Sequence, residues 1–186
     1  MLNKFFKSIF GKADAASESV QNLNVTEDSM NYIFLHTHHG QPLSNPNLVE
    51  QLAQLKSHYN NVTLVAYSSE YPTQVDKDLA AIDVTDDIDH VICGNANILT
   101  VNNEKNDSRL STRHTYDPQF WDRMNIEGTP VLPVDMFVIS NSEMDCDAAR
   151  MAGSQFHYFT QTASQKKNSN LAVNAVSQWL DKRTIN

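Results

Sequence analysis

Short apolar runs alternate with helix-forming segments along most of this chain, and that alternation constrains its fold more than any other feature. The runs favour strands because they are short, apolar and bounded by polar or glycine residues. Strands are predicted at 32–35, 62–67, 90–93, 136–140 and 156–160, and helices at 46–59, 73–82, 117–125, 143–152 and 171–180. Strands that alternate with helices pair in parallel through right-handed crossovers, so we expect an α/β, three-layer sandwich. The strands lack in–out alternation, as expected when both faces of the sheet are covered.

Three segments divide the chain. Residues 1–12, MLNKFFKSIFGK, predict a short basic amphipathic helix, with lysines between the apolar positions Leu2, Phe5, Phe6, Ile9 and Phe10. Residues 13–29 are polar and without strong periodicity, which indicates a flexible linker. The α/β domain is expected to occupy residues 30–186.

Residues 98–116 interrupt the alternation of strands and helices. They hold two runs of period two around an Asn-rich centre, a pattern that predicts a small β-hairpin insertion. Ligands of open α/β folds bind at the carboxyl ends of the strands. We therefore expect residues 98–116 to form a flap over that edge of the sheet.

Composition narrows the classes of function. The formal net charge of −8 argues against a general nucleic-acid binder, which needs a basic face. Two cysteines do not make a disulfide scaffold or a zinc cluster. No run approaches the roughly 18 apolar residues of a membrane span, and lysines break the N-terminal apolar run, unlike a signal peptide. A cytoplasmic protein is expected.

A polar tip followed by an alanine-bearing helix closes the predicted strand 136–140. The sequence from 140 to 153, SNSEMDCDAARMAG, resembles the fourth motif of the haloacid dehalogenase-like (HAD) superfamily, G-D-S-x-x-D-x-x-A-A-x-x-A-G. Eight residues fall on the motif positions without a gap: Ser140, Asn141, Ser142, Asp145, Ala148, Ala149, Ala152 and Gly153. Small alanines let such a helix lie close to the sheet, and Gly153 suits a left-handed cap. The resemblance implies a capless HAD-like domain with a mostly parallel sheet.

The other motifs of the superfamily are weaker in this chain. The second-motif Ser or Thr would be Ser68 or Ser69, and the third-motif lysine would fall near Thr115, with Arg113 the closest cation. Asp117-Pro118-Gln119-Phe120 resembles the segment that follows that lysine. The resemblance covers about residues 31–184.

The first motif, D-x-D-G-T, would fall on HTHHGQ at 36–41. Aligning the glycines puts Thr37 and His39 at its two aspartates, whereas a shift by one puts His36 and His38 there. Neither register supplies a carboxylate. In the fourth motif Asn141 replaces the metal-binding acid and leaves Asp145.

The chemistry implied by the resemblance needs an aspartate that attacks phosphorus and also binds Mg²⁺. Magnesium prefers charged oxygen ligands, so we expect neither an Mg²⁺ site, nor another cofactor, nor catalytic residues. The function expected is that of a binding module, an adaptor or accessory subunit of a larger assembly. Its contact surfaces would be the flap and residues 1–12. The latter suit a partner's groove or the inner face of a membrane, unless they fold back onto their own domain.

The histidines of HTHHG support a rival hypothesis. H-x-H at the end of a first strand resembles the opening of PHP-type phosphoesterases and amidohydrolases, whose imidazoles bind transition metals. His36 and His38, joined by His114, would then hold a divalent metal for phosphoester hydrolysis. A third hypothesis is a sensor that binds an anion through Ser68 and the N–H groups of a helix start.

Overall fold

The computed structural model describes residues 29–38, 41–42, 45–68, 77, 85–93, 114–160 and 165–184. The N-terminal segment 1–12, nearly all of the linker 13–29 and residues 98–113 of the flap lie outside these ranges. The predicted helix 73–82 also lies outside them, apart from Lys77. The structure therefore does not test those predictions.

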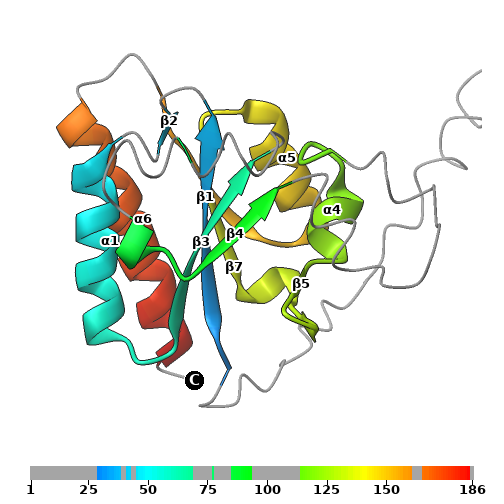
Figure 1. The fold of residues 1–186 in the computed structure, drawn as a ribbon, viewed down its shortest axis with the longest axis horizontal. Coiled ribbons are helices and arrows are strands. Elements are labelled where there is room, and N and C mark those ends of the chain that lie inside the picture. Colours follow the sequence, from blue (N-terminus) through cyan, green and yellow to red (C-terminus); the bar gives the residue numbers. More distant parts are fainter. Residues whose placement is uncertain are drawn as a thin grey trace, which may run out of the picture.

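A parallel sheet forms the centre of the domain (Figure 1). Its strands are β1 (Asn31–His38), β3 (Val62–Ser68), β4 (His90–Cys93), β7 (Met136–Ser140) and β8 (Gln155–Tyr158), in the spatial order β4-β3-β1-β7-β8. The short strand β2 (Gln41–Pro42) pairs antiparallel with the end of β1. The predicted parallel α/β fold is thus confirmed.

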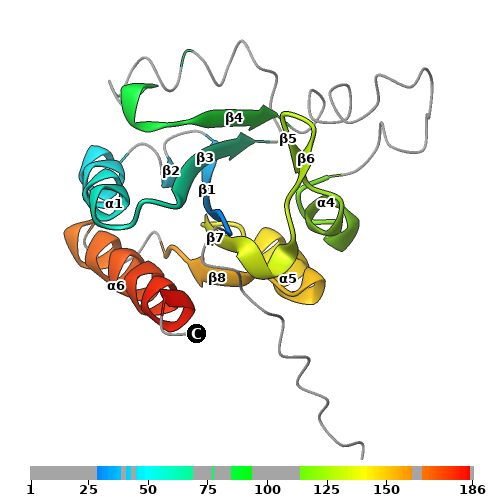
Figure 2. The same cartoon turned by 90° about the horizontal axis from the view of Figure 1, so that it is seen from below.

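Helices cover both faces of this sheet, which gives the expected three layers (Figure 2). On one face lie α1 (Pro46–His58) and α6 (Gln165–Thr184), and on the other lie α4 (Pro118–Asp122) and α5 (Glu143–Ala152). Single turns of 3₁₀ helix occur at η1 (Thr85–Asp87) and η2 (Pro133–Asp135). None of the helices in the described ranges is long and apolar enough to cross a membrane.

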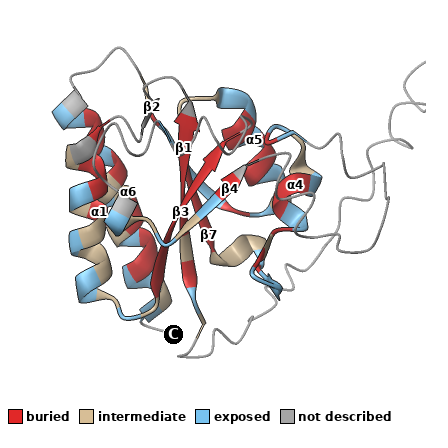
Figure 3. Ribbon diagram, viewed as in Figure 1, coloured by how far each residue is buried: buried red, intermediate tan, exposed pale blue. Residues whose placement is uncertain are grey.

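The core is divided by the sheet into two apolar clusters. Ile33 and Leu35 of β1 pack with α1 and α6 in the first cluster, whereas Phe34 packs with Trp121 of α4 in the second. Every residue of β3 is buried (Figure 3). Burial on both faces explains why the strand sequences show no alternation of apolar and polar residues.

The central position of β1 brings distant parts of the sequence to one edge. Along β1, His36 lies beside Tyr67 of β3, and Leu35 lies beside Ile139 of β7. Since all three strands are parallel, their carboxyl ends meet at this edge. The predicted first, second and fourth motifs therefore meet there.

Helix α5 begins and ends where its sequence predicts. The Ser142 hydroxyl accepts a hydrogen bond from the Asp145 N–H, so Ser142 is the N-cap. Gly153 is left-handed, with φ of 101°, and its N–H bonds the carbonyls of Ala149 and Arg150. Both caps are encoded by the residues that carry the resemblance at 140–153.

Other boundaries differ from the predictions. Helix α6 spans 165–184 instead of 171–180, and β8 spans 155–158 instead of 156–160. Helix α4 spans 118–122 instead of 117–125, because Asn125 already begins a hairpin of β5 (Asn125–Ile126) and β6 (Thr129–Pro130). Its turn places Glu127 and Gly128 at φ of 52° and 86°. Glutamate is not expected at such a position, so residues 125–130 carry no clear hairpin signal.

Candidate functional site

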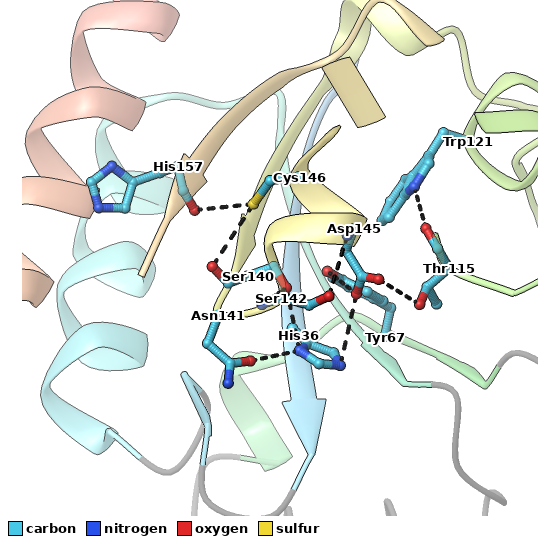
Figure 4. Close-up of polar contacts among 10 residues, drawn as sticks. All are labelled: His36, Tyr67, Thr115, Trp121, Ser140, Asn141, Ser142, Asp145, Cys146 and His157. Atoms are coloured by element: carbon cyan, nitrogen blue, oxygen red, sulfur yellow. Dashed lines mark hydrogen bonds and ion pairs between the residues drawn. The ribbon is translucent and has the colours of Figure 1, made fainter. Parts of the chain in front are cut away.

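The carboxylate of Asp145 lies at the carboxyl edge of the sheet, in the first turn of α5, and the residue is 3% exposed. Its Oδ1 accepts a hydrogen bond from the Thr115 hydroxyl at 2.9 Å. Its Oδ2 accepts one from the Tyr67 hydroxyl at 3.3 Å (Figure 4). Trp121 in turn donates its indole N–H to the Thr115 carbonyl at 2.8 Å. Both carboxylate oxygens are thus bound by hydroxyls from the protein's own core.

His36 lies between Asp145 and Asn141. Its ring stacks on Tyr67, with centroids 5.0 Å apart. Its Nδ1 lies 3.0 Å from the Asn141 Oδ1 and 3.3 Å from the Ser140 Oγ, and its Nε2 lies 3.9 Å from the Asp145 Oδ2. A carbonyl oxygen only accepts hydrogen bonds, so the contact with Asn141 requires the proton on Nδ1.

Two ionisable groups beside Asp145 are held in their neutral forms. Burial and, second, the Asp145 charge raise the pKa of Tyr67 well above its usual value of 10.0. The same two causes raise the pKa of Cys146 from 9.0 to about 12. Tyr67 therefore remains a hydrogen-bond donor at neutral pH. Cys146, whose Sγ lies 3.9 Å from the carbonyls of Ser140 and His157, is a buried thiol and no nucleophile.

His36 and Thr37, one from each register of the expected first motif, lie on opposite faces of the sheet. His36 shares the α4–α5 face of the sheet with Phe34 and Tyr67, and it faces Asn141. Thr37 is 2% exposed and, by strand alternation, lies on the opposite face with Leu35. His36 therefore lies on the face of the sheet that holds Asn141 and Asp145, and Thr37 lies on the other face. The side chains of His38 and His39 lie outside the described residues.

The two predicted partners from the second and third motifs behave differently. Thr115, near which the third-motif lysine would fall, contacts Asp145 directly. Ser68 is fully buried, and strand alternation puts it on the face of Ala66, away from Asp145. Ser69 and Arg113 are outside the described ranges.

The described contact of His114 is with an aromatic ring. It is exposed and stacks on the ring of Tyr116, with centroids 4.7 Å apart. Among the residues that the structure describes, no group of three or more His, Cys, Asp and Glu side chains is placed to hold a metal ion.

Sequence reasoning missed the contact made by Tyr67. An aromatic residue in an apolar strand is normally read as core, and Tyr67 is indeed buried within the second cluster. Its hydroxyl nevertheless reaches Asp145. Its position in the sequence could have indicated this contact. A tyrosine near the carboxyl end of the strand that follows β1 brings a hydroxyl donor to the edge of the sheet where Asp145 lies.

Comparisons with known proteins identify the fold. The sequence matches no family model and no curated protein. Among solved structures, the domain resembles a Thermotoga maritima protein provisionally named a β-phosphoglucomutase, with a TM-score of 0.50 and 13% identity over 70% of this chain. The chain spans 58% of the length of that structure. At this identity the likeness shows the fold alone, a mostly parallel α/β sandwich of the kind that the resemblance at 140–153 implies.

Proposed function

We propose that this domain is a HAD-like protein without phosphotransfer activity, which acts by binding a protein partner as an adaptor or accessory subunit. One observation carries the proposal: His36 faces Asn141 where the resemblance calls for two carboxylates. An imidazole and an amide stand where a nucleophile and a metal-binding acid would be needed.

The remaining acid, Asp145, already accepts hydrogen bonds on both carboxylate oxygens. One comes from the Thr115 hydroxyl and the other from the Tyr67 hydroxyl, and Asp145 is 3% exposed. A cation bound there would compete with these two hydrogen bonds for a carboxylate that is closed off from solvent.

Mg²⁺, the usual cofactor of this fold, does not fit the donors at this edge. It requires near-octahedral oxygen ligands and gives up its waters reluctantly unless carboxylates replace them. His36 and Asn141 offer nitrogen and a neutral amide, and they bond each other at 3.0 Å. We therefore assign no step to a metal.

The activity test compares the natural chain with His36→Asp/Asn141→Asp. We expect no Mg²⁺-dependent hydrolysis of acetyl phosphate or p-nitrophenyl phosphate by the natural chain, and no rise in its melting temperature with Mg²⁺. The double variant restores two carboxylates at one strand edge, so Mg²⁺ should raise its melting temperature by linkage. His36→Gln/Asn141→Gln, which adds no charge, serves as its control.

Hydrolysis of a phosphoester by the natural chain would support the rival hypothesis, a phosphoesterase that uses the HTHHG histidines. The enzymatic name of the structural neighbour is the observation in its favour. In that case the untagged natural chain would carry stoichiometric zinc, manganese or iron and would hydrolyse phosphoesters. A His36→Ala/His38→Ala variant would lose both the metal and the turnover.

The binding role is tested on residues 1–12, whose apolar face is proposed to contact a partner or a membrane-associated complex. Phe6→Glu/Phe10→Glu places charges on that face, whereas Asn3→Glu/Ser8→Glu adds the same charge elsewhere on the segment. Chemical cross-linking in the native host, read by mass spectrometry, should identify partners lost only in the first variant. Equal loss in both variants would contradict a specific apolar contact.

A further inference from the structure

Strand β8, residues 155–158, forms one edge of the sheet (Figure 2). In the described part of the chain it pairs only with β7, so its other side presents unpaired backbone donors and acceptors. Gln155, Phe156 and Tyr158 are all exposed.

The sequence around this edge has none of the residues that normally block edge-to-edge pairing. From Gly153 to Thr160 it reads GSQFHYFT, with no charge and no proline. Two large rings stand two residues apart: Phe156 is 38% exposed and Tyr158 is 43% exposed. Their register with Val138 and Ser140 puts both rings on the face of the sheet that α5 covers.

We propose that β8 pairs antiparallel with β8 of a second copy of this chain, about a two-fold axis through His157. In that register Phe156 lies opposite Tyr158 of the second copy, and Tyr158 lies opposite its Phe156. Both cross-strand pairs are aromatic, a favourable pairing between antiparallel strands. Because the interface is isologous, one self-complementary strand suffices to close it.

Charge on α5 supports this occupant and this orientation. The Cys146 Sγ lies 3.9 Å from the His157 carbonyl, so that side of α5 faces β8. Glu143 and Arg150, three residues before and four after Cys146, lie on the same side and are exposed. Glu143 lies at the carboxyl end of β8 and Arg150 at its start, because α5 runs antiparallel to the strand.

An antiparallel second copy reverses this order. Glu143 of each copy then lies over Arg150 of the other, and the two contacts are equivalent by symmetry. Among the residues that the structure describes, the Arg150 guanidinium pairs with the exposed Asp147 in its own helix, at 3.2 Å, a weak pair that a second copy can exchange. A parallel two-fold pairing of the same edges would put the two α5 helices on opposite faces of the sheet and lose this complementarity.

A four-residue strand with two aromatic pairs buries little surface, so association should be weak and concentration-dependent. Sedimentation velocity of the full chain, from about 5 to 500 µM, should show a 21.0 kDa monomer passing into a dimer. Phe156→Lys, which places a charge on the edge, should raise the dissociation constant at least tenfold. Met151→Lys adds the same charge at a 70% exposed position on another side of α5 and should leave the association unchanged.

Exchanging the charges of Glu143 and Arg150 distinguishes a loss of this interface from a loss of folding. Glu143→Arg alone and Arg150→Glu alone should each weaken the dimer, whereas the double variant should restore it, since only the order of charges is reversed. The proposal is overturned if the natural chain stays monomeric at 500 µM. It is also overturned if Phe156→Lys dimerises normally, or if the double variant is as weak as the sum of the single ones.

Discussion

At the scale of single residues, the site is organised by one buried carboxylate. Asp145 is held by hydroxyls from two separate segments, Tyr67 at the end of β3 and Thr115 before α4. A buried charge is tolerated only when its oxygens are satisfied. The same hydrogen bonds that satisfy Asp145 also tie the beginning of α5 to the sheet and to α4.

Thr115→Val removes one of these donors with little change of shape. It should lower the free energy of unfolding by about 1–3 kcal/mol, because the Asp145 Oδ1 then lacks a buried partner. Urea denaturation followed by circular dichroism measures this. Thr129→Val, at an exposed position in β6, should change stability by less than about 0.5 kcal/mol. Equal effects of the two changes would mean that the Asp145 contact contributes nothing.

The raised pKa values of Cys146 and Tyr67 predict a loss of stability in alkali. Each pKa is higher in the folded chain than in the unfolded one, so folding favours the protonated form. The Cys146 contribution is complete below pH 9.0 and is lost as the pH rises through about 12, and that of Tyr67 is lost above pH 10.0.

Urea-unfolding midpoints measured at pH 8 and above test whether stability falls as the pH rises. The natural chain should lose stability steadily above pH 9, and Cys146→Ala and Tyr67→Phe should each flatten that decline. Tyr116→Phe, which changes an exposed ring, should keep the natural slope. A flat profile for the natural chain would refute the prediction.

At the residue level, the sequence placed Asn141 and Asp145 together because the motif at 140–153 fixes their spacing, and in the structure both lie beside His36. Thr115 was placed only by the weaker third-motif alignment, and it contacts Asp145. The role of Tyr67 was not predictable from local pattern. Its hydroxyl acts across 78 positions of sequence, and only the pairing of the strands reveals the contact.

At the scale of elements, α5 shows how far sequence fixes local structure. Its first and last residues were predicted because Ser142 and Gly153 are strong capping residues. Helix α6 was predicted only from its apolar stripe, which covers its middle, although Ser164, a residue type favoured at N-caps, precedes its Gln165 start. Its bounds were therefore underestimated.

Gly153→Ala tests the left-handed cap of α5. A Cβ at this position would meet only the Pro133 Cβ at 3.9 Å, so the cost comes from φ of 101° and not from crowding. We expect a loss of about 1–2 kcal/mol in unfolding free energy. Gly153→Asn should lose less, because asparagine tolerates the left-handed region. If the two variants are equally stable in thermal and urea unfolding, backbone strain is not the cause.

At the scale of the whole molecule, charge divides the chain in two. Residues 1–12 carry three lysines and no acid, whereas residues 13–186 carry 11 Lys and Arg against 22 Asp and Glu. An acidic body is repelled by an anionic lipid surface, so any attraction to such a surface has to come from the N-terminal segment.

Vesicle co-sedimentation tests this division. The full chain should bind vesicles with anionic lipid more than neutral ones, and added salt should weaken that binding. Lys4→Glu/Lys7→Glu/Lys12→Glu should abolish it. Lys77→Glu/Lys166→Glu/Lys167→Glu makes the same change of net charge at exposed positions of the domain and should retain most of it. Equal loss would point to net charge alone.

The layered architecture was predictable as a whole because it follows from the order of strands and helices. The 125–130 hairpin was not, because its Glu-Gly turn lacks the usual residues. The order of strands in the sheet was also not predicted. It depends on β1, which lies between β3 and β7 although β7 is about a hundred residues further along the chain.

That central place of β1 has a consequence for synthesis. A ribosome that adds about 5–20 residues per second completes β7 roughly 5–20 s after β1. During that interval one edge of β1 has no partner strand, so a nascent chain would need a chaperone or the exit tunnel to shield it. Pauses in translation between β4 and β7 should therefore lower the yield of soluble protein, whereas pauses after β8 should not.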